Sequence, residues 1–326
     1  MVGGDRSAAG FWRVAAFLIS LLGGLPASAG TYSTVIENDV FSGTDLNYTS
    51  GLRVGYVTDE DRGAALARAL LRAGATAKTR LGFAVGQSLY TPADIATAAP
   101  LPDQHPYAGW LYGEFSVIAN RGRALDVMTL NLGVVGPRAF GEEAQNSLHR
   151  WLRGSEAQGW ANQLRDEPGL ILSFDRIWRP ITLTSGDGLR FDITPHAGVS
   201  VGNVLTQAKT GLSFRFGAGL ENDFGPPRIR PSVSSGGYIE RRPGLTWYLF
   251  AGGEARGVAR NMFLDGNTFR DSLSVDKRPF AADAQGGIVV QVKRFQAAYT
   301  YVWRRREFEA QDDPQKFGAL SFSILF

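Results

Sequence analysis

Residues 319–326 have the sequence Ala-Leu-Ser-Phe-Ser-Ile-Leu-Phe, and this stretch decides the fold class. The larger apolar side chains alternate with small or polar ones: Leu320, Phe322, Ile324 and Phe326 against Ala319, Ser321 and Ser323. A period of two predicts a strand with one apolar face. In a transmembrane barrel that face meets lipid and the other meets the lumen. The edge of a soluble sandwich would show the same alternation, so both classes stay open at this point.

The N-terminal residues favour the barrel. Arg6 and Arg13 precede an apolar run at 14–22, and Ala27-Ser28-Ala29 matches a small-residue cleavage site. The run is far shorter than the ~20 residues of a spanning helix. We therefore expect residues 1–29 to be a signal peptide. Residues 30–326 are then expected to form one exported barrel domain that ends at Phe326 after its last strand.

The composition agrees with an exported β-protein. The chain has 40 Gly, 20 Phe, 10 Tyr and 7 Trp but no Cys, so disulfides cannot stabilise it. Stability must then come from sheet closure or from a large core. The formal net charge of +3 is far below the basic excess of a nucleic-acid binder.

Twelve candidate strands of about ten residues recur along the chain, as spanning barrel strands do. They are expected at roughly 31–39, 49–58, 80–90, 107–118, 125–135, 169–178, 189–199, 209–219, 245–255, 281–292, 295–305 and 316–326. An even count places both termini on the periplasmic side. The segments 40–48, 91–106, 136–168, 200–208, 256–280 and 306–315 then lie on the external rim.

Two periplasmic connections, 59–79 and 220–244, are longer than such turns usually are. The first has a helical composition. These two connections are the weakest points of the strand count.

Three polar groups meet at the predicted external rim. They are Glu37-Asn38-Asp39, Tyr48-Thr49-Ser50, and Gln145 and His149 followed by Glu156. The last group belongs to a short helix expected near 140–156, on which Gln145 and His149 project from one face because they are four residues apart. Hairpin loops need no such grouping for stability, so it indicates function.

Several motifs, in order, resemble the lipid A 3′-O-deacylase family of calcium-dependent outer-membrane enzymes. They are Glu37-Asn38-Asp39-Val40-Phe41-x-Gly43-Thr44-Asp45, Tyr48-Thr49-Ser50-Gly51, Tyr107-Ala108-Gly109-Trp110, Val135-Gly136-Pro137, Gln145-Asn146-x-x-His149-Arg150, Gly159-Trp160-x-Asn162-Gln163-Leu164, Asp265-Gly266-Asn267-Thr268-Phe269 and Glu307-Phe308-Glu309. The resemblance covers nearly the whole of residues 30–326. It implies an all-β, antiparallel, up-and-down transmembrane barrel of twelve strands, in agreement with the strand count.

The resemblance also implies a set of site residues. The family's positions match Asn38, Asp39, Thr49, Gln145, His149 and Glu156. Ester hydrolysis needs a base for water, a role that suits His149. The amides of Asn38 or Gln145 could donate to the oxyanion or orient the histidine. Asp39 is the expected ligand of a Ca²⁺ ion, with Thr49 and Glu156 as further ligands or supports.

The expected activity is therefore removal of the 3′-linked acyloxyacyl chain of lipid A in the bacterial outer membrane. The site would face the external leaflet, with lipopolysaccharide as substrate and no obligate protein partner. The chain departs from many relatives at His105, where they have Arg. That histidine could replace an arginine contact to phosphate or have no such role.

Three other functions are open. One is an outer-membrane phospholipase, and the second is a non-catalytic barrel such as a pore or an adhesion protein. The third is a serine hydrolase, because residues 198–202 match G-x-S-x-G, but that motif requires a helix directly after its strand.

Overall fold

The structure, a computed structural model, describes residues 29–39, 47–152, 155–179, 181–185, 187–225, 237–241 and 243–326. The predicted signal peptide lies outside these residues except for Ala29. Most of the first predicted external segment, 40–48, lies outside them as well.

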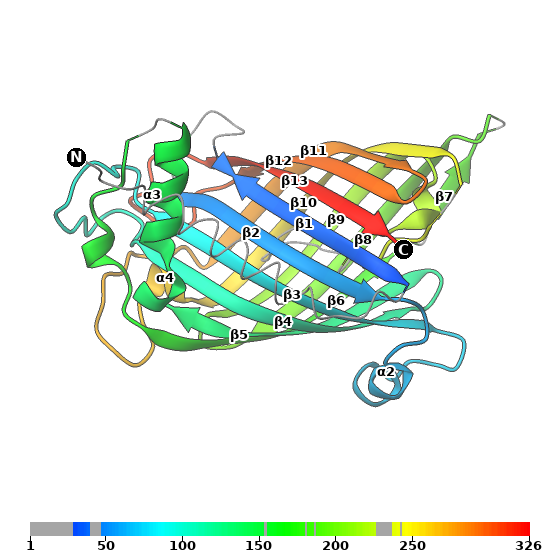
Figure 1. The fold of residues 1–326 in the computed structure, drawn as a ribbon, viewed down its shortest axis with the longest axis horizontal. Coiled ribbons are helices and arrows are strands. Elements are labelled where there is room, and N and C mark those ends of the chain that lie inside the picture. Colours follow the sequence, from blue (N-terminus) through cyan, green and yellow to red (C-terminus); the bar gives the residue numbers. More distant parts are fainter. Residues whose placement is uncertain are drawn as a thin grey trace, which may run out of the picture.

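Long antiparallel strands form the wall of a barrel (Figure 1). They are β1 (Gly30–Asn38), β2 (Asn47–Thr58), β3 (Lys78–Thr91), β4 (Ala108–Asn120), β5 (Ala124–Val135), β6 (Glu167–Trp178), β8 (Arg190–Val201), β9 (Leu205–Ala218), β10 (Leu245–Asn261), β11 (Phe280–Val292), β12 (Phe295–Arg304) and β13 (Gln315–Leu325). Each corresponds to one predicted strand.

The sheet closes on itself. β1 pairs with β13, and β6 pairs with β8, so the wall has no open edge at either place. A thirteenth strand, β7 (Ile181–Thr184), pairs with residues 190–193 of β8, next to the residues 196–201 that pair with β6. Because β7 continues the line of β6, the barrel has twelve strand positions, and the prediction of a closed twelve-stranded barrel is confirmed.

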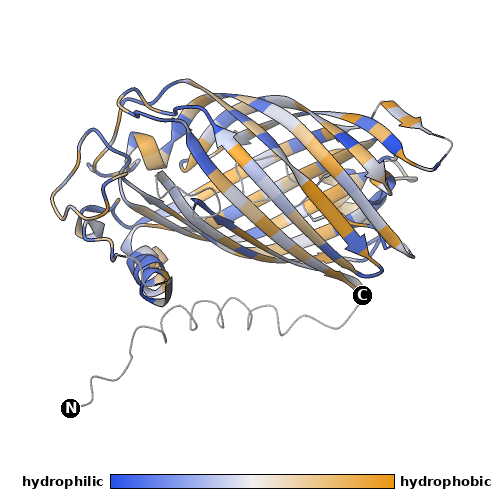
Figure 2. Cartoon of the chain, turned by 90° about the horizontal axis from the view of Figure 1, so that it is seen from above, coloured by the Kyte–Doolittle hydropathy of each residue, from blue (hydrophilic) through white to orange (hydrophobic). Residues whose placement is uncertain are grey.

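Alternation along the strands separates a lipid face from a lumen face. In β9, Phe214 and Phe216 are 42% and 45% exposed, whereas Arg215 between them is 1% exposed. In β13, Phe322 is exposed, while Ser321 and Ser323 are buried inside. Figure 2 shows the same alternation of hydrophobic and hydrophilic residues along the strands.

The two ends of the barrel differ. At the end that we call the loop end lie α3 (Gly141–Leu152), α4 (Met262–Asp265) and the short 3₁₀ turns η2 (Pro137–Ala139) and η3 (Trp160–Asn162) (Figure 1). The helix predicted near 140–156 is therefore confirmed as α3. At the opposite, terminal end lie the start of β1, the end of β13 and α2 (Ala64–Leu71). Within the described part of the chain, no helix is both long and apolar enough to cross a membrane.

The two long connections at the terminal end lie on different sides of the wall. Residues 59–77 include α2, which packs against the outside of the wall. Residues 219–225 and 237–241, which include η4 (Leu220–Asn222), enter the lumen instead. There, Phe224 and Tyr238 pack with inward-facing residues of β2, β4, β5 and β6. Both segments thus have a place in the fold without adding strands to the wall.

Candidate functional site

The predicted residues of the first polar group lie at the loop end of β1. Ile36 is 37% exposed on the lipid face, and side chains alternate along a strand, so Asn38 shares that outer face. Asn38 lies opposite Ser50 of β2. Asn38 and Asp39 are nevertheless buried, at 8% and 0% exposure, which means that other groups cover this part of the wall.

Thr49 occupies a bulge in β2. The register shifts between Tyr48 and Ser50, so Thr49 is an extra residue opposite β3. Its hydroxyl lies 2.6 Å from the hydroxyl of Thr91. Thr91 follows Tyr90, whose ring faces the lumen, so both threonine hydroxyls lie on the outer face. Neighbouring strands are about 5 Å apart, so the loop ends of β1, β2 and β3 bring Asn38, Thr49 and Thr91 within about 10 Å.

Helix α3 packs on this outer face, against β3 and β4 (Figure 1). The outward-facing Gln87 of β3 donates from Nε2 to the carbonyl oxygen of Ala139 at 2.6 Å, which fixes the segment that leads into α3. Leu89, also on the outer face, packs with Ala144 of α3 and with Trp160. The helix therefore lies next to the strand ends that carry Thr49 and Thr91.

The orientation of the Gln145 amide is determined by Trp160. The indole Nε1 of Trp160 donates to Oε1 of Gln145 at 2.7 Å. Because an indole N–H can only donate, the other end of the amide must be Nε2, the donor end. That Nε2 atom is buried and has no hydrogen-bond partner among the residues that the structure describes. A buried donor without a partner is costly, so this atom marks a position for an acceptor from a ligand.

The imidazole of His149 is oriented by a backbone carbonyl. Nδ1 lies 2.5 Å from the carbonyl oxygen of Ser155. A carbonyl only accepts, so in the neutral ring Nδ1 carries the proton and Nε2 keeps its lone pair. His149 thus presents a basic nitrogen on the same helix face as Gln145, one turn further along.

Asn146 fixes the segment that carries the Ser155 carbonyl. Its Oδ1 accepts from the backbone N–H of Ala157 at 2.8 Å, and its Nδ2 donates to the Ala157 carbonyl at 3.3 Å. The segment that contains Ser155 is thereby fixed to α3. Asn146, Trp160 and Thr91 were not predicted as site residues, although the first two fall within quoted motifs.

One of the six predicted residues, Glu156, contacts a residue outside the predicted set. Glu156 pairs with Arg150, with Arg150 Nη1 and Glu156 Oε1 2.7 Å apart, and its side chain is 42% exposed. Among the described residues, no group of three or more His, Cys, Asp or Glu could hold a metal ion. Asp39, Asn38 and Thr49 instead offer one carboxylate and neutral oxygen atoms. Hard oxygen donors of this kind fit Ca²⁺ rather than a transition metal.

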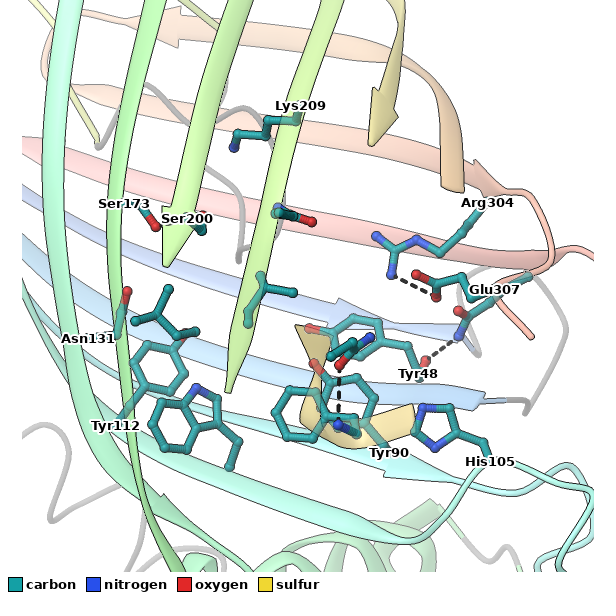
Figure 3. A pocket seen from close by; sticks show the side chains of 17 residues that line it. Tyr48, Tyr90, His105, Tyr112, Asn131, Ser173, Ser200, Lys209, Arg304 and Glu307 are labelled. Atoms are coloured by element: carbon teal, nitrogen blue, oxygen red, sulfur yellow. Dashed lines mark hydrogen bonds and ion pairs between the residues drawn. The ribbon is translucent and has the colours of Figure 1, made fainter. Parts of the chain in front are cut away.

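The lumen at the loop end contains a separate cavity (Figure 3). Its volume is about 50 Å³, which is room for only a few water molecules and not for an acyl chain. Ser200 of the G-x-S-x-G match lines it from within β8, with its hydroxyl 2.9 Å from that of Ser173 and without a following helix. The structure therefore does not support a serine nucleophile there.

His105 also lines this cavity. Its ring stacks on Tyr90 at a centroid distance of 5.4 Å, and its Nδ1 lies 2.8 Å from the carbonyl oxygen of Pro106. Burial lowers the pKa of His105 to about 4. A neutral, buried histidine in the lumen cannot replace an arginine contact to a phosphate on the outer face.

Comparisons with known proteins identify the fold and the family. A family model described as "Outer membrane protein LpxR" matches residues 11–326. The solved structure of LpxR from Salmonella typhimurium has a TM-score of 0.75 and 18% identity, and the match covers 91% of this chain and 100% of that one. At such identity the similarity shows the fold. The β domain of a Bordetella autotransporter is more distant, with a TM-score of 0.47, 10% identity, and 92% and 100% coverage.

No curated protein matches the chain. The family model, however, spans nearly the whole sequence and both polar strand ends as well as α3. The chain therefore belongs to the LpxR family of outer membrane proteins.

Proposed function

We propose that this protein is a calcium-dependent lipid A 3′-O-deacylase of the bacterial outer membrane, a hydrolase of the ester that joins the 3′-linked acyloxyacyl chain. The observation that carries the proposal is the pair on α3, in which Gln145 and His149 have fixed, complementary orientations. One presents a buried donor without a partner, and the other presents a basic nitrogen. Membership of the LpxR family supports lipid A as the substrate.

His149 acts as the general base. Its Nε2 takes a proton from a water molecule, whose oxygen then attacks the ester carbonyl carbon. The Ser155 carbonyl accepts from Nδ1–H and stabilises the positive charge that develops on the ring. When the tetrahedral intermediate collapses, Nε2–H returns the proton to the 3′ oxygen. The products are a free fatty acid and the 3′ hydroxyl, and no acyl-enzyme forms.

Gln145 Nε2 donates to the oxyanion. The amide is already oriented by Trp160 before substrate binds, so the donor requires no reorganisation during the reaction. Asn38 is the second candidate donor, because its amide lies at the end of β1 on the same outer face. Both groups are nearly excluded from water, which strengthens their interaction with a developing charge.

Asp39, with Asn38 and Thr49, would hold the calcium ion. A bound Ca²⁺ supplies Lewis-acid polarisation of the ester carbonyl. Glu156 would join these ligands only after its ion pair with Arg150 opens. We therefore propose that Glu156 supports the site through its ion pair with Arg150.

The position of the site explains how acyl chains would reach it. The site lies on the outside of the wall, next to the lipid-exposed Ile36, and not in the lumen. Acyl chains can therefore approach laterally from the membrane. Outer-membrane barrels place their longer loops outside the cell. We therefore infer that the loop end faces the external leaflet, where lipopolysaccharide is found.

The test is an assay of released fatty acid by mass spectrometry. The purified full-length protein is incubated with lipid A or with glycerophospholipid, each with calcium or with a chelator. We expect lipid A turnover that requires calcium and that falls by about 10²–10⁴-fold in His149→Ala, the usual contribution of a general base. Glu143→Ala, an exposed change on the same helix, serves as the matched control.

Two outcomes would contradict the proposal. Turnover of lipid A that survives chelation or His149→Ala would exclude the mechanism. Turnover of phospholipid alone would instead identify an outer-membrane phospholipase.

A further inference from the structure

Helix α2 packs against the lipid-facing wall at the terminal end of the barrel. Its Ala67 and Leu71 are buried against Val117 and Ala119 of β4. Ile118 between them packs with Tyr238 in the lumen, so Val117 and Ala119 point outward. The surface that α2 covers therefore belongs to the outer wall, which faces lipid in a membrane.

The two sides of α2 next to its buried residues, Ala67 and Leu71, differ in polarity. Successive residues of a helix are rotated by about 100°, so residues 66 and 70 lie on one side of the buried residues and residue 68 lies on the other. The first side carries Leu66 and Leu70, which are 41% and 48% exposed. The other carries Arg68, and Arg72 follows as the C-cap residue of the helix; both are exposed and have no ion-pair partner among the described residues. Such a division is typical of helices that lie in a membrane interface.

A polar cluster next to α2 marks the level of the interface. Asp126 lies between Leu125 and Val127, which face the lumen, so its carboxylate is on the outer wall. It pairs with Arg121 at 2.7 Å and with Arg176 at 2.5 Å. Arg121 also donates from Nη2 to the carbonyl oxygen of Leu71 at 2.6 Å, which fixes the end of α2 to the β4–β5 turn.

The adjacent outer surface of the wall is apolar. Leu81, Phe115, Met128 and Phe174 pack partly buried around α2. In Figure 1 the barrel axis runs across the picture and α2 is seen nearly end-on, so the helix lies across that axis. A helix with this direction runs parallel to the plane of a membrane that the barrel spans. The helix thus lies where the apolar belt meets the polar cluster.

We propose that α2 is a membrane-surface helix that binds the phospholipid leaflet at the terminal end of the barrel. Leu66 and Leu70 insert among the acyl chains, and Arg68 and Arg72 contact lipid phosphates. The partner is an anionic glycerophospholipid surface, because two unpaired arginines beside an apolar side fit phosphates above acyl chains. The proposal does not depend on deacylase activity, and its test needs no substrate.

The absence of cysteine from the chain allows a clean test. Single variants Leu70→Cys, Arg68→Cys and Ala75→Cys are labelled with an environment-sensitive fluorophore. Each full-length protein is reconstituted in vesicles of phosphatidylethanolamine and phosphatidylglycerol. All three positions are exposed, so the barrel should fold in each variant. Ala75, in the turn after α2, gives the baseline for a solvated position.

We expect nitroxide groups on the lipid acyl chains to quench the label at position 70 several-fold more than the labels at 68 and 75. Iodide in the water should quench in the reverse order. This result holds whichever way the barrel inserts, because both vesicle surfaces carry the same lipids. Equal quenching by iodide at all three positions would overturn the proposal and would indicate a side available to a soluble partner instead.

A second measurement tests the arginines. Quenching at position 70 by the nitroxide lipids should increase with the fraction of phosphatidylglycerol. This dependence should be lost when Arg68→Gln and Arg72→Gln are combined with Leu70→Cys. A dependence that survives both changes would show that these arginines are not the groups that contact phosphate.

Discussion

At the scale of single residues, one indole decides what Gln145 can do. Its buried Nε2 is free to donate only because Trp160 occupies the opposite end of the amide. In Gln145→Leu the donor is lost while the volume is nearly kept. We expect kcat for lipid A hydrolysis to fall by about 10²–10³-fold, the usual effect of removing an oxyanion donor. Gln158→Leu, an exposed glutamine beyond the helix, should leave kcat unchanged.

Asn146 is a positioning residue in this scheme. Asn146→Ala removes both hydrogen bonds to Ala157 and so releases the segment whose Ser155 carbonyl orients His149. We expect kcat to fall by about 10–100-fold with little change in KM, as is usual when the partner of a functional histidine is lost. The acidic limb of the pH–rate profile should also shift. An equal loss in kcat and in thermal stability, with an unchanged pH profile, would indicate a purely structural role.

Some of these residues could be grouped into one site from the sequence alone, and others could not. Gln145 and His149 could be grouped because a helix places residues four apart on one face, which is a local rule. Trp160 lies 15 residues from Gln145, and its contact depends on how the segment after α3 folds back. No periodic pattern in the sequence predicts that this segment folds back onto α3. Thr49 and Thr91 likewise meet only through the register of β2 and β3.

At the scale of elements, the stack of His105 on Tyr90 anchors the segment between β3 and β4 to the lumen. The pKa of His105 is lowered to about 4 when the ring is buried, against 6.5 when it is free. Below pH 6.5 the opened segment binds a proton that the closed one does not. The closed form is therefore fully favoured at neutral pH and is destabilised as the pH falls.

Hydrogen exchange of residues 92–107 measures this effect. Between pH 7 and pH 5, after correction for intrinsic exchange rates, protection should fall by about 20-fold. His105→Phe keeps a ring for stacking but cannot titrate, so its protection should not change over this range. The same fall in His105→Phe would show that another group controls the opening.

Strands were the elements that the sequence predicted best. Alternation of apolar and polar residues located all twelve, because one face must meet lipid and the other the lumen. The ends of the strands in the structure differ from the predicted ends by a few residues. β10 continues to Asn261 and reaches beyond the membrane, where alternation no longer has to be apolar. β7 was not predicted separately, since it is a short continuation of β6, which ends at Trp178.

The two long connections could not be placed from the sequence alone. Their length was clear, but only contacts with distant strands place α2 on the outer wall and residues 219–225 and 237–241 in the lumen. Arg80 of β3 lies over the ring of Tyr238 at 4.3 Å and donates from Nη1 to the carbonyl oxygen of Ile239 at 3.0 Å. Asn120 of β4 donates to the Tyr238 hydroxyl at 2.9 Å.

At the scale of the whole molecule, these contacts hold residues 237–239 inside the lumen at its terminal end. Arg179 lies over the ring of Phe224 at 4.1 Å, so cations and aromatic rings together fill the opening. At the loop end, Tyr90 stacks on Phe263 of α4 at 4.1 Å, beside His105. Between the two ends, buried ion pairs link strands across the lumen side of the wall: Arg53 of β2 with Glu114 of β4, Lys209 of β9 with Asp175 of β6, and Arg304 of β12 with Asp283 of β11.

A lumen filled in this way should not conduct ions. Among the described residues, the partners of these ion pairs are nearly inaccessible to water, and opening one pair would leave an unpaired buried charge. We expect the purified protein, reconstituted in planar bilayers, to give no discrete conductance steps. Insertion is verified independently by the heat-dependent electrophoretic mobility of the folded barrel. Regular steps from inserted protein would instead indicate a pore, and would move the function from the outer wall to the lumen.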